Sequence, residues 1–151
     1  MEWHVFSEAH EPLTDELVDG IEKVLRFTLP RDYVECVKRF HGGQPKDRTL
    51  SINVNGEPWG IGFGMLLTLD PLQSSENIIN ALVALRTHHQ LPEHYLPIVV
   101  GGGGDYLCLD YSENPLLPKV VFYFHELGLP DGLFEVADSF SSLLGMLQEE
   151  R

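Results

Sequence analysis

The run of four glycines and an aspartate from Gly101 to Asp105 has the composition of a possible ligand-binding loop. A phosphate-binding loop needs backbone N–H donors that converge at the start of a helix, and the Walker form adds Lys and Ser or Thr after its second glycine. Here no lysine follows, the aspartate repels phosphate, and the alternating residues from Tyr106 to Tyr111 are typical of a strand. We therefore predict a turn between antiparallel strands, in which glycines supply positive φ angles.

Seven histidines raise the question of a metal site. Four of them, His88, His89, His94 and His125, can approach one another only through folding. The chain contains no HExxH, no CxxC and no pair of histidines four residues apart, and such spacings are typical of metal ligands. We expect surface or core histidines, with no metal and no cofactor.

No motif for nucleophilic or acid–base catalysis is present. GxSxG is absent, and SFSSLL near the C-terminus is typical of a capped helix. His125-Glu126 resembles half of an acid–base pair, but no nucleophile motif accompanies it. The acidic residues that could act as general bases, with no spacing that selects a pair, are Asp47, Asp70, Asp105, Asp110 and Glu126. The sequence thus gives an enzyme no positive support, although active sites also assemble from distant residues.

The 151 residues carry a formal net charge of −13, from 10 basic and 23 acidic side chains. This charge opposes binding to nucleic acids and anionic membranes, and it favours a basic protein partner unless it serves only solubility. No apolar run approaches the ~20 residues of a membrane span, and the first residues lack signal-peptide features. Cys36 and Cys108 match no metal spacing, so we expect both to be reduced and buried in a cytoplasmic protein.

Four segments have the apolar spacing of amphipathic helices. The first runs from Leu13 to Phe27, and the second ends at Gly42-Gly43. The predicted N-caps or first residues of the four helices are Thr14, Pro30, Ser74 or Ser75, and Ser139 or Asp138. The apolar positions expected to face the core include Leu17, Val18, Ile21, Val24, Leu25, Tyr33, Val34, Val37, Phe40, Ile78, Ile79, Leu82, Val83, Phe140, Leu143, Leu144 and Leu147.

Strand patterns dominate the middle of the chain. The predicted strands are Thr49–Val54, Trp59–Met65, Tyr95–Val100, Asp105–Tyr111 and Lys119–His125. Asn55-Gly56 joins the first two and is a strong hairpin signal. Helices at both ends and strands between them predict a single α+β domain with a mainly antiparallel sheet.

The stretch WGIGFGM, residues 59–65, has one face of large apolar side chains and one face of glycines only. The two sets are Trp59, Ile61, Phe63 and Met65 on one side, and Gly60, Gly62 and Gly64 on the other. A strand with a bare face is costly in conformational entropy, so a compensating contact is expected. We predict that an element of the chain itself packs against the glycines, with a bound ligand as the alternative.

Several segments in this order resemble the SUKH superfamily, which includes the yeast cell-wall-synthesis regulator and many bacterial immunity proteins. They are LPRDYVECVKRFHGG, LDP followed by ENII, YLPIVVGGGGDYLCLDY, KVVFYFHE and ADSFSSLL. Each motif is weak alone, but the ordered set is fairly specific. The resemblance covers about Thr14 to Leu147 of a domain that we expect to span residues 1–151.

The resemblance implies an α+β domain with a sheet of about six strands flanked by helices, and a role without catalysis. Bacterial members typically bind and neutralise a toxin domain, often a nuclease, whereas eukaryotic members act as scaffolds in signalling. The family features map onto Leu29-Pro30, Gly42-Gly43, Asp70-Pro71, Gly102 to Gly104, Leu109-Asp110 and His125-Glu126. Most of these features are turns, caps and strand ends.

The chain departs from the family pattern at two points. Many relatives carry an acid or amide just before the glycines, where this chain has Val100 and Gly101. Many also carry an aspartate before the His-Glu pair, where this chain has Phe124. Either apolar contact replaces charge at these points, or the acidic patch lies elsewhere.

The leading hypothesis is therefore an immunity protein whose acidic face mimics a phosphate backbone and covers the basic cleft of a toxin. Trp59 and Tyr111 would serve as aromatic anchors. The residues predicted to contact the partner are Trp59, Asp70, Asp105, Asp110, Tyr111 and Glu126. The alternatives are a regulatory scaffold, or a small-molecule binder or enzyme that uses the glycine face and the region of His88 and His89.

Overall fold

Helices at the two ends of the chain enclose a run of antiparallel strands. The computed structural model describes residues 1–6, 10–73 and 75–148. The helices are α1 (Asp15–Leu25), α2 (Arg31–Phe40), α3 (Ile78–His88), the 3₁₀ helix η1 (His125–Leu127) and α4 (Phe140–Met146). The strands are β1 (Trp3–Val5), β2 (Gly43–Pro45), β3 (Thr49–Val54), β4 (Glu57–Gly62), β5 (Met65–Leu66), β6 (Tyr95–Val100), β7 (Tyr106–Asp110), β8 (Lys119–Tyr123) and β9 (Leu133–Ala137).

The strands divide into one five-stranded sheet and two pairs. The larger sheet has the order β5-β6-β7-β8-β9, and the pairs are β1-β2 and β3-β4. Every neighbouring pair is antiparallel. The predicted α+β class with mainly antiparallel strands is confirmed, with five strands in the main sheet and the rest in separate pairs.

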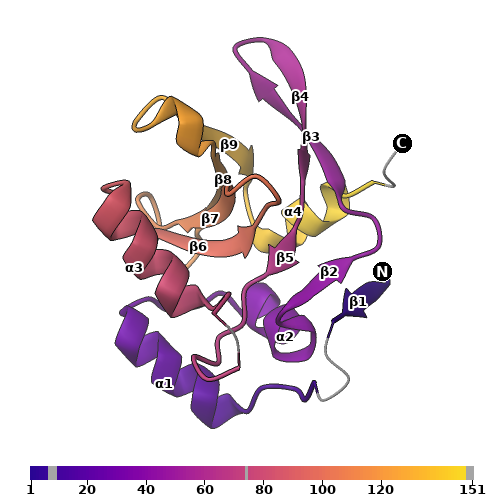
Figure 1. Cartoon of the computed structure of the whole chain (residues 1–151), viewed down its shortest axis with the longest axis vertical. Helices are drawn as coiled ribbons and strands as arrows, with labels where there is room; N and C mark the ends of the chain where they lie inside the picture. The colour runs from indigo at the N-terminus through magenta and orange to yellow at the C-terminus, as the bar shows by residue number, and fades with distance from the viewer. Residues whose placement is uncertain (7–9, 74, 149–151) are drawn as a thin grey trace.

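The helices flank this sheet, and the β3–β4 hairpin projects from one end of the molecule (Figure 1). Helix α3 packs against β6, while α4 packs against β8, β9 and α2. The buried side chains of α1, among them Val18 and Ile21, belong to the same apolar core as Leu96 and Leu109 of the sheet. The sheet therefore provides a rigid base from which the hairpin extends.

Side-chain caps begin two of the four helices where the sequence predicts them. The Thr14 Oγ1 accepts a hydrogen bond from the N–H of Leu17 at 3.1 Å, and the Ser139 Oγ accepts one from Ser142 at 3.0 Å. Helix α2 differs slightly, because Pro30 is its N-cap and not its first helical residue. These caps supply acceptors for N–H groups that a helix start leaves unpaired.

Two details of the helix predictions are wrong. Helix α3 is capped by Asn77, whose side chain accepts from Asn80 N at 2.9 Å, and not by Ser75; Ser74 lies outside the described residues. The apolar side chains Val24 and Val83 do not face the core, since they are 64% and 58% exposed. Each of the two residues is adjacent in sequence to a buried residue of its helix. The helical spacing of apolar residues therefore predicted that they face the core.

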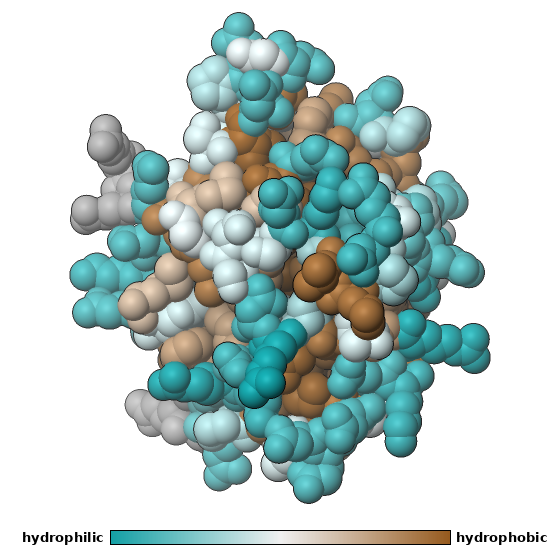
Figure 2. Space-filling model, turned by 180° about the vertical axis from the view of Figure 1, so that it is seen from behind, coloured by the Kyte–Doolittle hydropathy of each residue, from teal (hydrophilic) through white to brown (hydrophobic). Residues whose placement is uncertain are grey.

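The molecular surface seen from behind is largely hydrophilic, with hydrophobic side chains between the polar ones (Figure 2). Large apolar side chains that are exposed in the described residues include Leu72, Leu116 and Leu117. Over the same residues, the helices lack the combination of length and apolar character that crossing a bilayer requires. The two cysteines carry free thiols, Cys108 buried and Cys36 half-buried. Burial raises the pKa of the Cys36 thiol to about 12, which disfavours the reactive thiolate.

Candidate protein-binding cleft

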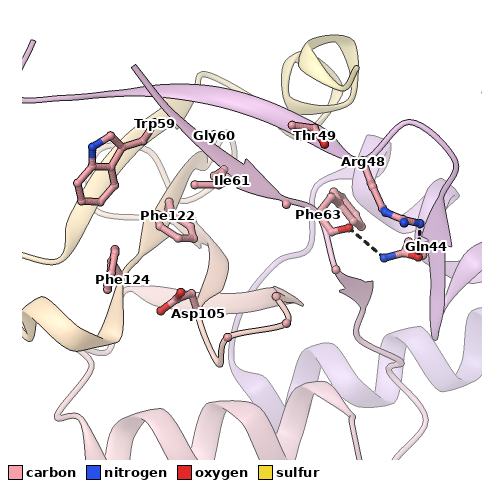
Figure 3. A pocket seen from close by; sticks show the side chains of 15 residues that line it. Gln44, Arg48, Thr49, Trp59, Gly60, Ile61, Phe63, Asp105, Phe122 and Phe124 are labelled. Atoms are coloured by element: carbon pink, nitrogen blue, oxygen red, sulfur yellow. Dashed lines mark hydrogen bonds between the residues drawn. The ribbon is translucent and has the colours of Figure 1, made fainter. Parts of the chain in front are cut away.

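A cleft of about 550 Å³ separates the β3–β4 hairpin from the turn between β6 and β7 (Figure 3). The two glycine-rich segments singled out in the sequence lie on its opposite walls. It is lined by Gln44, Arg48, Thr49, Trp59, Gly60, Ile61, Gly62, Phe63, Gly64, Gly101, Gly102, Gly103, Asp105, Phe122 and Phe124. The separate sequence signals thus converge on one site.

The first wall is β4, the outer strand of the hairpin. Asn55 and Gly56 have φ angles of 53° and 87°, as a tight two-residue turn requires, so the predicted hairpin is confirmed. The prediction that the chain covers the glycine face is wrong for most of this strand. A Cβ on Gly60 would meet no atom within 4 Å, and one on Gly62 would only reach the Arg48 carbonyl oxygen at 4.0 Å. The glycines of β4 therefore leave an open face.

The hairpin meets the main sheet at Gly64, where the predicted strand through residues 59–65 is interrupted. A Cβ on Gly64 would lie 2.0 Å from the carbonyl oxygen of Val100. No real side chain tolerates that distance, so the close approach of two backbones explains this glycine. This contact fixes the distance between the hairpin and β6 at the inner end of the cleft.

The second wall is the glycine turn, which the structure confirms as a connection between antiparallel strands. Gly101 N–H donates to the Asp105 carbonyl oxygen at 2.8 Å, and Gly104 N–H donates to Gly101 O at 3.3 Å. Gly104 has a φ of 83°, a left-handed conformation that favours glycine. The turn leads into β7 and not into a helix, so its N–H groups lack the helix dipole of a phosphate-binding loop.

Asp105 ties this turn to the start of η1. Its Oδ1 accepts hydrogen bonds from the backbone N–H of His125 at 3.0 Å and from Nδ1 of the same residue at 2.6 Å. The two side chains are only 22% and 33% exposed, so the pair is partly shielded from water. This geometry holds the glycine turn in place, and it uses one carboxylate oxygen of the acid that was predicted to meet a partner.

Aromatic side chains form the outer part of the cleft. The Trp59 ring lies 5.6 Å from that of Phe124 and 6.2 Å from that of Phe134, centroid to centroid. Phe122 packs edge-on against Phe124 at 6.4 Å. Trp59, Phe122 and Phe124 face the cleft (Figure 3). Trp59 and Phe124 are half-buried and Phe122 is buried, and aromatic side chains are enriched in the central parts of protein interfaces.

Polar groups occupy the opposite end of the cleft. The Arg48 Nη1 donates to Gln44 Oε1 at 2.9 Å, and Gln44 Nε2 lies 3.5 Å from the Phe63 carbonyl oxygen (Figure 3). The cleft therefore runs from an aromatic end to a polar end formed by Arg48 and Gln44, with Asp105 between them. It offers apolar contact and hydrogen bonds at the same time.

Of the six residues predicted to contact a partner, only Trp59 and Asp105 line this cleft. Glu126 is exposed on η1, next to His125, and so lies near the glycine turn. Asp70 and Asp110 lie elsewhere and accept hydrogen bonds from the backbone N–H groups of residues 72 and 112, both at 2.9 Å. Those two acids mainly order their own turns.

Tyr111 is placed in the core and not at the cleft. It is only 7% exposed, and its hydroxyl donates to the Thr28 carbonyl oxygen at 2.9 Å. Its ring packs against that of Phe27 at 4.6 Å, and burial raises its pKa well above the usual value. Tyr111 thus joins the end of β7 to the loop between α1 and α2 and offers little surface to a partner.

Sequence reasoning did not identify Arg48, Gln44 and Phe122 as cleft residues, since nothing in their local pattern distinguishes them. A signal did exist for Gly101 and Phe124, because both are positions where the chain departs from the family pattern. The structure brings these two positions to the same cleft. At both positions this chain has an uncharged residue, which agrees with an aromatic and backbone-rich surface there.

The histidines do not form a metal centre within residues 1–6, 10–73 and 75–148, where no three His, Cys, Asp or Glu side chains gather as ligands. His89 Nδ1 lies 3.0 Å from the Tyr123 hydroxyl, and its ring centroid is 6.2 Å from that of His125. These contacts place His89 beside the Asp105–His125 pair at the base of the glycine turn.

The resemblance to the SUKH superfamily is confirmed by a family model that matches most of the chain. More specifically, the chain belongs to the SMI1 / KNR4 family (SUKH-1), whose family model matches residues 12–146. The chain is also similar to the SPbeta prophage-derived uncharacterized protein YokK of Bacillus subtilis (strain 168). The two are 29% identical over 150 residues, which cover 91% of this chain and 76% of the relative.

Proposed function

We propose that this protein is a non-catalytic binding domain that neutralises a bacterial toxin domain by direct contact. The observation that carries the proposal is the aromatic-walled cleft on a chain of net charge −13. Family membership supports it, because the bacterial branch that the motifs resemble consists largely of immunity proteins. The prophage origin of the similar Bacillus protein is compatible with a gene carried in conflicts between cells.

Occlusion explains how such a surface would inactivate a toxin without chemistry. The acidic chain attracts a basic toxin over long range and raises the association rate. On docking, Trp59 and Phe124 provide apolar contact area, while the Asp105–His125 pair keeps the glycine turn rigid. A preformed site loses little entropy on binding, which favours tight complexes.

Two further properties belong to this proposal. The protein catalyses no reaction, and its partner is a basic protein and not a nucleic acid or membrane. It acts in the cytoplasm, where free thiols such as Cys36 and Cys108 persist.

The test is co-expression with toxin domains encoded beside this gene. We expect the wild-type chain to rescue growth and to copurify with one of them. Trp59→Ala should weaken the complex at least tenfold, because it removes the largest aromatic surface of the cleft. Leu116→Ala is the matched control, since Leu116 is 69% exposed but lies outside the cleft. Failure of every neighbouring toxin to bind would refute the proposal.

A second candidate is a small-molecule binder, favoured by the cleft volume of about 550 Å³ and its backbone-lined glycine wall. Nucleotides, sugars and divalent metals can be screened by thermal shift. A saturable rise of the melting temperature that is lost in Trp59→Ala would support this candidate over the first. A regulatory scaffold is the third, and a toxin gene beside this one would speak against it.

A further inference from the structure

The outer edge of β4 carries unpaired backbone groups that face the cleft. Residues of an antiparallel hairpin alternate between those that bond to the partner strand and those whose N–H and C=O point away. Pro58 lies opposite Asn53 and has no N–H, so this pair is of the non-bonded kind. Bonded pairs are then Val54 with Glu57 and, two residues further along each strand, Ile52 with Trp59.

Two observations at the other end of the strand fix the same alternation. Thr49, opposite Gly62, exchanges its N–H and C=O with Gln148 at 3.1 and 2.7 Å, and therefore turns them away from β4. Phe63 N–H donates to Arg48 O at 2.7 Å, which continues the inward series of odd-numbered residues. The outward groups of β4 consequently belong to Pro58, Gly60 and Gly62.

These outward groups are accessible. Among the described residues, the outward N–H and C=O groups of Gly60 and Gly62 have no hydrogen-bond partner. The Gly62 carbonyl oxygen lies 3.8 Å from the position that a Cβ on Gly101 would take, so the glycine turn borders this end of the edge. Both glycines are exposed, so an approaching backbone can reach their outward groups. Two such residues with one residue between them match the repeat of a β-ladder.

The occupant that fits such an edge is an extended polypeptide. A strand laid beside β4 would receive and donate hydrogen bonds at Gly60 and Gly62, as in other cases of strand addition. Every second side chain of that strand would face Trp59 and Ile61 and should be apolar. The intervening side chains would lie over the bare glycines, where a long aliphatic stem can cover the open backbone.

Charge decides between a foreign strand and a second copy of this chain. Two copies of net charge −13 repel each other over long range, and Glu57 at the exposed start of β4 adds a negative charge to each of the two edges. A basic segment is attracted by the same charges. We propose that the β4 edge binds an extended, basic segment of the partner protein by strand addition at Gly60 and Gly62, an inference that rests on the proposed function.

Backbone amide exchange measured by NMR tests the first part of this proposal on the chain alone. The amides of Trp59 and Ile61 should exchange slowly, because they donate to β3, and those of Gly60 and Gly62 should exchange fast. A capped heptapeptide in which lysine alternates with valine is the probe for binding. It should slow both glycine amides at least tenfold, with saturation at about 1 mM or below.

The matched control is the same peptide with alternate backbone nitrogens methylated on its hydrogen-bonding side. It keeps the charge and the side chains but loses the donors. Protection of Gly60 and Gly62 by the parent peptide alone supports strand addition. Equal effects of the two peptides, or no protection by either, overturn it.

A variant pair extends the test to the protein. Gly60→Pro removes one outward N–H and leaves the bonds to β3, so it should weaken the parent peptide about tenfold, whereas Gly60→Ala should stay within about twofold. Continued slow exchange at Trp59 shows that the hairpin is intact in Gly60→Pro. If the hairpin unfolds in this variant, protection of the Gly62 amide by the parent peptide in Gly60→Ala decides whether the peptide binds as a strand. A toxin that binds without slowing the Gly60 and Gly62 amides refutes strand addition but not the proposed function. If no toxin binds, the proposed function fails and the peptide result still decides whether this edge accepts a strand.

Discussion

The two glycine-rich walls of the cleft differ in what surrounds them. Around the turn at Gly101–Gly104, backbone hydrogen bonds close the turn, and the Asp105–His125 pair joins it to the start of η1. Along β4, Gly60 and Gly62 have open space where a side chain would stand. In the first wall Gly104 adopts a positive φ that favours glycine, whereas in the second wall Gly60 and Gly62 leave one face of an exposed strand bare. The fixed wall and the open wall should therefore respond to mutation in opposite ways.

The largest effect is expected from alanine at the junction of the two walls. Gly64→Ala places a Cβ 2.0 Å from Val100 O, so backbones must separate, and we expect a loss of about 3–5 kcal/mol in the free energy of unfolding. Gly60→Ala meets nothing within 4 Å and should gain about 0.5–1 kcal/mol, because alanine loses less entropy in a strand. Urea unfolding of both variants measures the difference. Similar free energies of unfolding for the two variants would contradict the difference between the closed contact at Gly64 and the open face at Gly60.

A smaller loss is expected from the pair that anchors the fixed wall. Asp105→Ala removes the acceptor of two His125 donors and should cost about 1–3 kcal/mol. Asp105→Asn keeps an oxygen for the backbone N–H and should lose less. Asp19→Ala, an exposed position on α1, serves as control and should change stability by less than about 0.5 kcal/mol. The order of the three melting temperatures checks this prediction, and it fails if Asp105→Ala behaves like the control.

Tyr111→Phe separates the core from the cleft. The hydroxyl bond to Thr28 O is lost, so stability should fall by about 1 kcal/mol, while partner binding should not change. Calorimetric unfolding and a binding titration give the two quantities. Weaker partner binding at unchanged stability would contradict this and would show that Tyr111 contacts the partner, as the sequence predicts.

The smallest expected effect is a loss of stability at acidic pH that is caused by one buried histidine. His41, 1% exposed, donates from Nε2 to Glu11 O at 2.8 Å, and its Nδ1 accepts from the Thr68 hydroxyl at 2.8 Å. Burial is the main cause that lowers its pKa, with His10 lowering and Glu11 O and Asp70 raising it to lesser degrees. The unfolded chain therefore binds more protons below about pH 6.5, and stability declines as the pH falls through that value towards the pKa of the folded state.

The variant His41→Gln should remove this part of the pH dependence, whereas His88→Gln, at an exposed site on α3, should not. Melting temperatures between pH 7.5 and 5.5 provide the comparison. If both variants show the same dependence of melting temperature on pH as the wild type, groups other than His41 cause the loss of stability in acid.

Local chemistry explains which parts of the fold could be predicted from the sequence. The caps at Thr14 and Ser139 and the turn at Asn55-Gly56 depend on neighbouring residues only, and all three are confirmed. Strands β1 and β2 have three residues each, too few for a period, and the prediction omitted both along with β9. The α3 cap depends on where Ile78 enters the core, which local preference for serine does not reveal.

The site was predictable only in part for the same reason. Trp59 and Asp105 were identified from local patterns, a half-apolar strand and a glycine turn. Their proximity to Phe124 and Arg48 arises from the packing of the hairpin over the sheet, which no spacing in the sequence encodes. The prediction for β4 was wrong because an uncovered glycine strand is unfavourable in conformational entropy, and no local pattern shows that the fold leaves this face open.

The bridge between Thr49 and Gln148 has one more consequence. Gln148, two residues beyond the end of α4, pairs with Thr49 on the side of β3 away from β4, so the chain's own backbone covers that flank of the hairpin at Thr49. On β4, by contrast, the outward backbone groups of Gly60 and Gly62 have no such cover within the described residues. The two edges of the hairpin therefore differ where they meet the main sheet: the edge of β3 is closed at Thr49 by the segment after α4, and the edge of β4 stays open beside the aromatic side chains of the cleft.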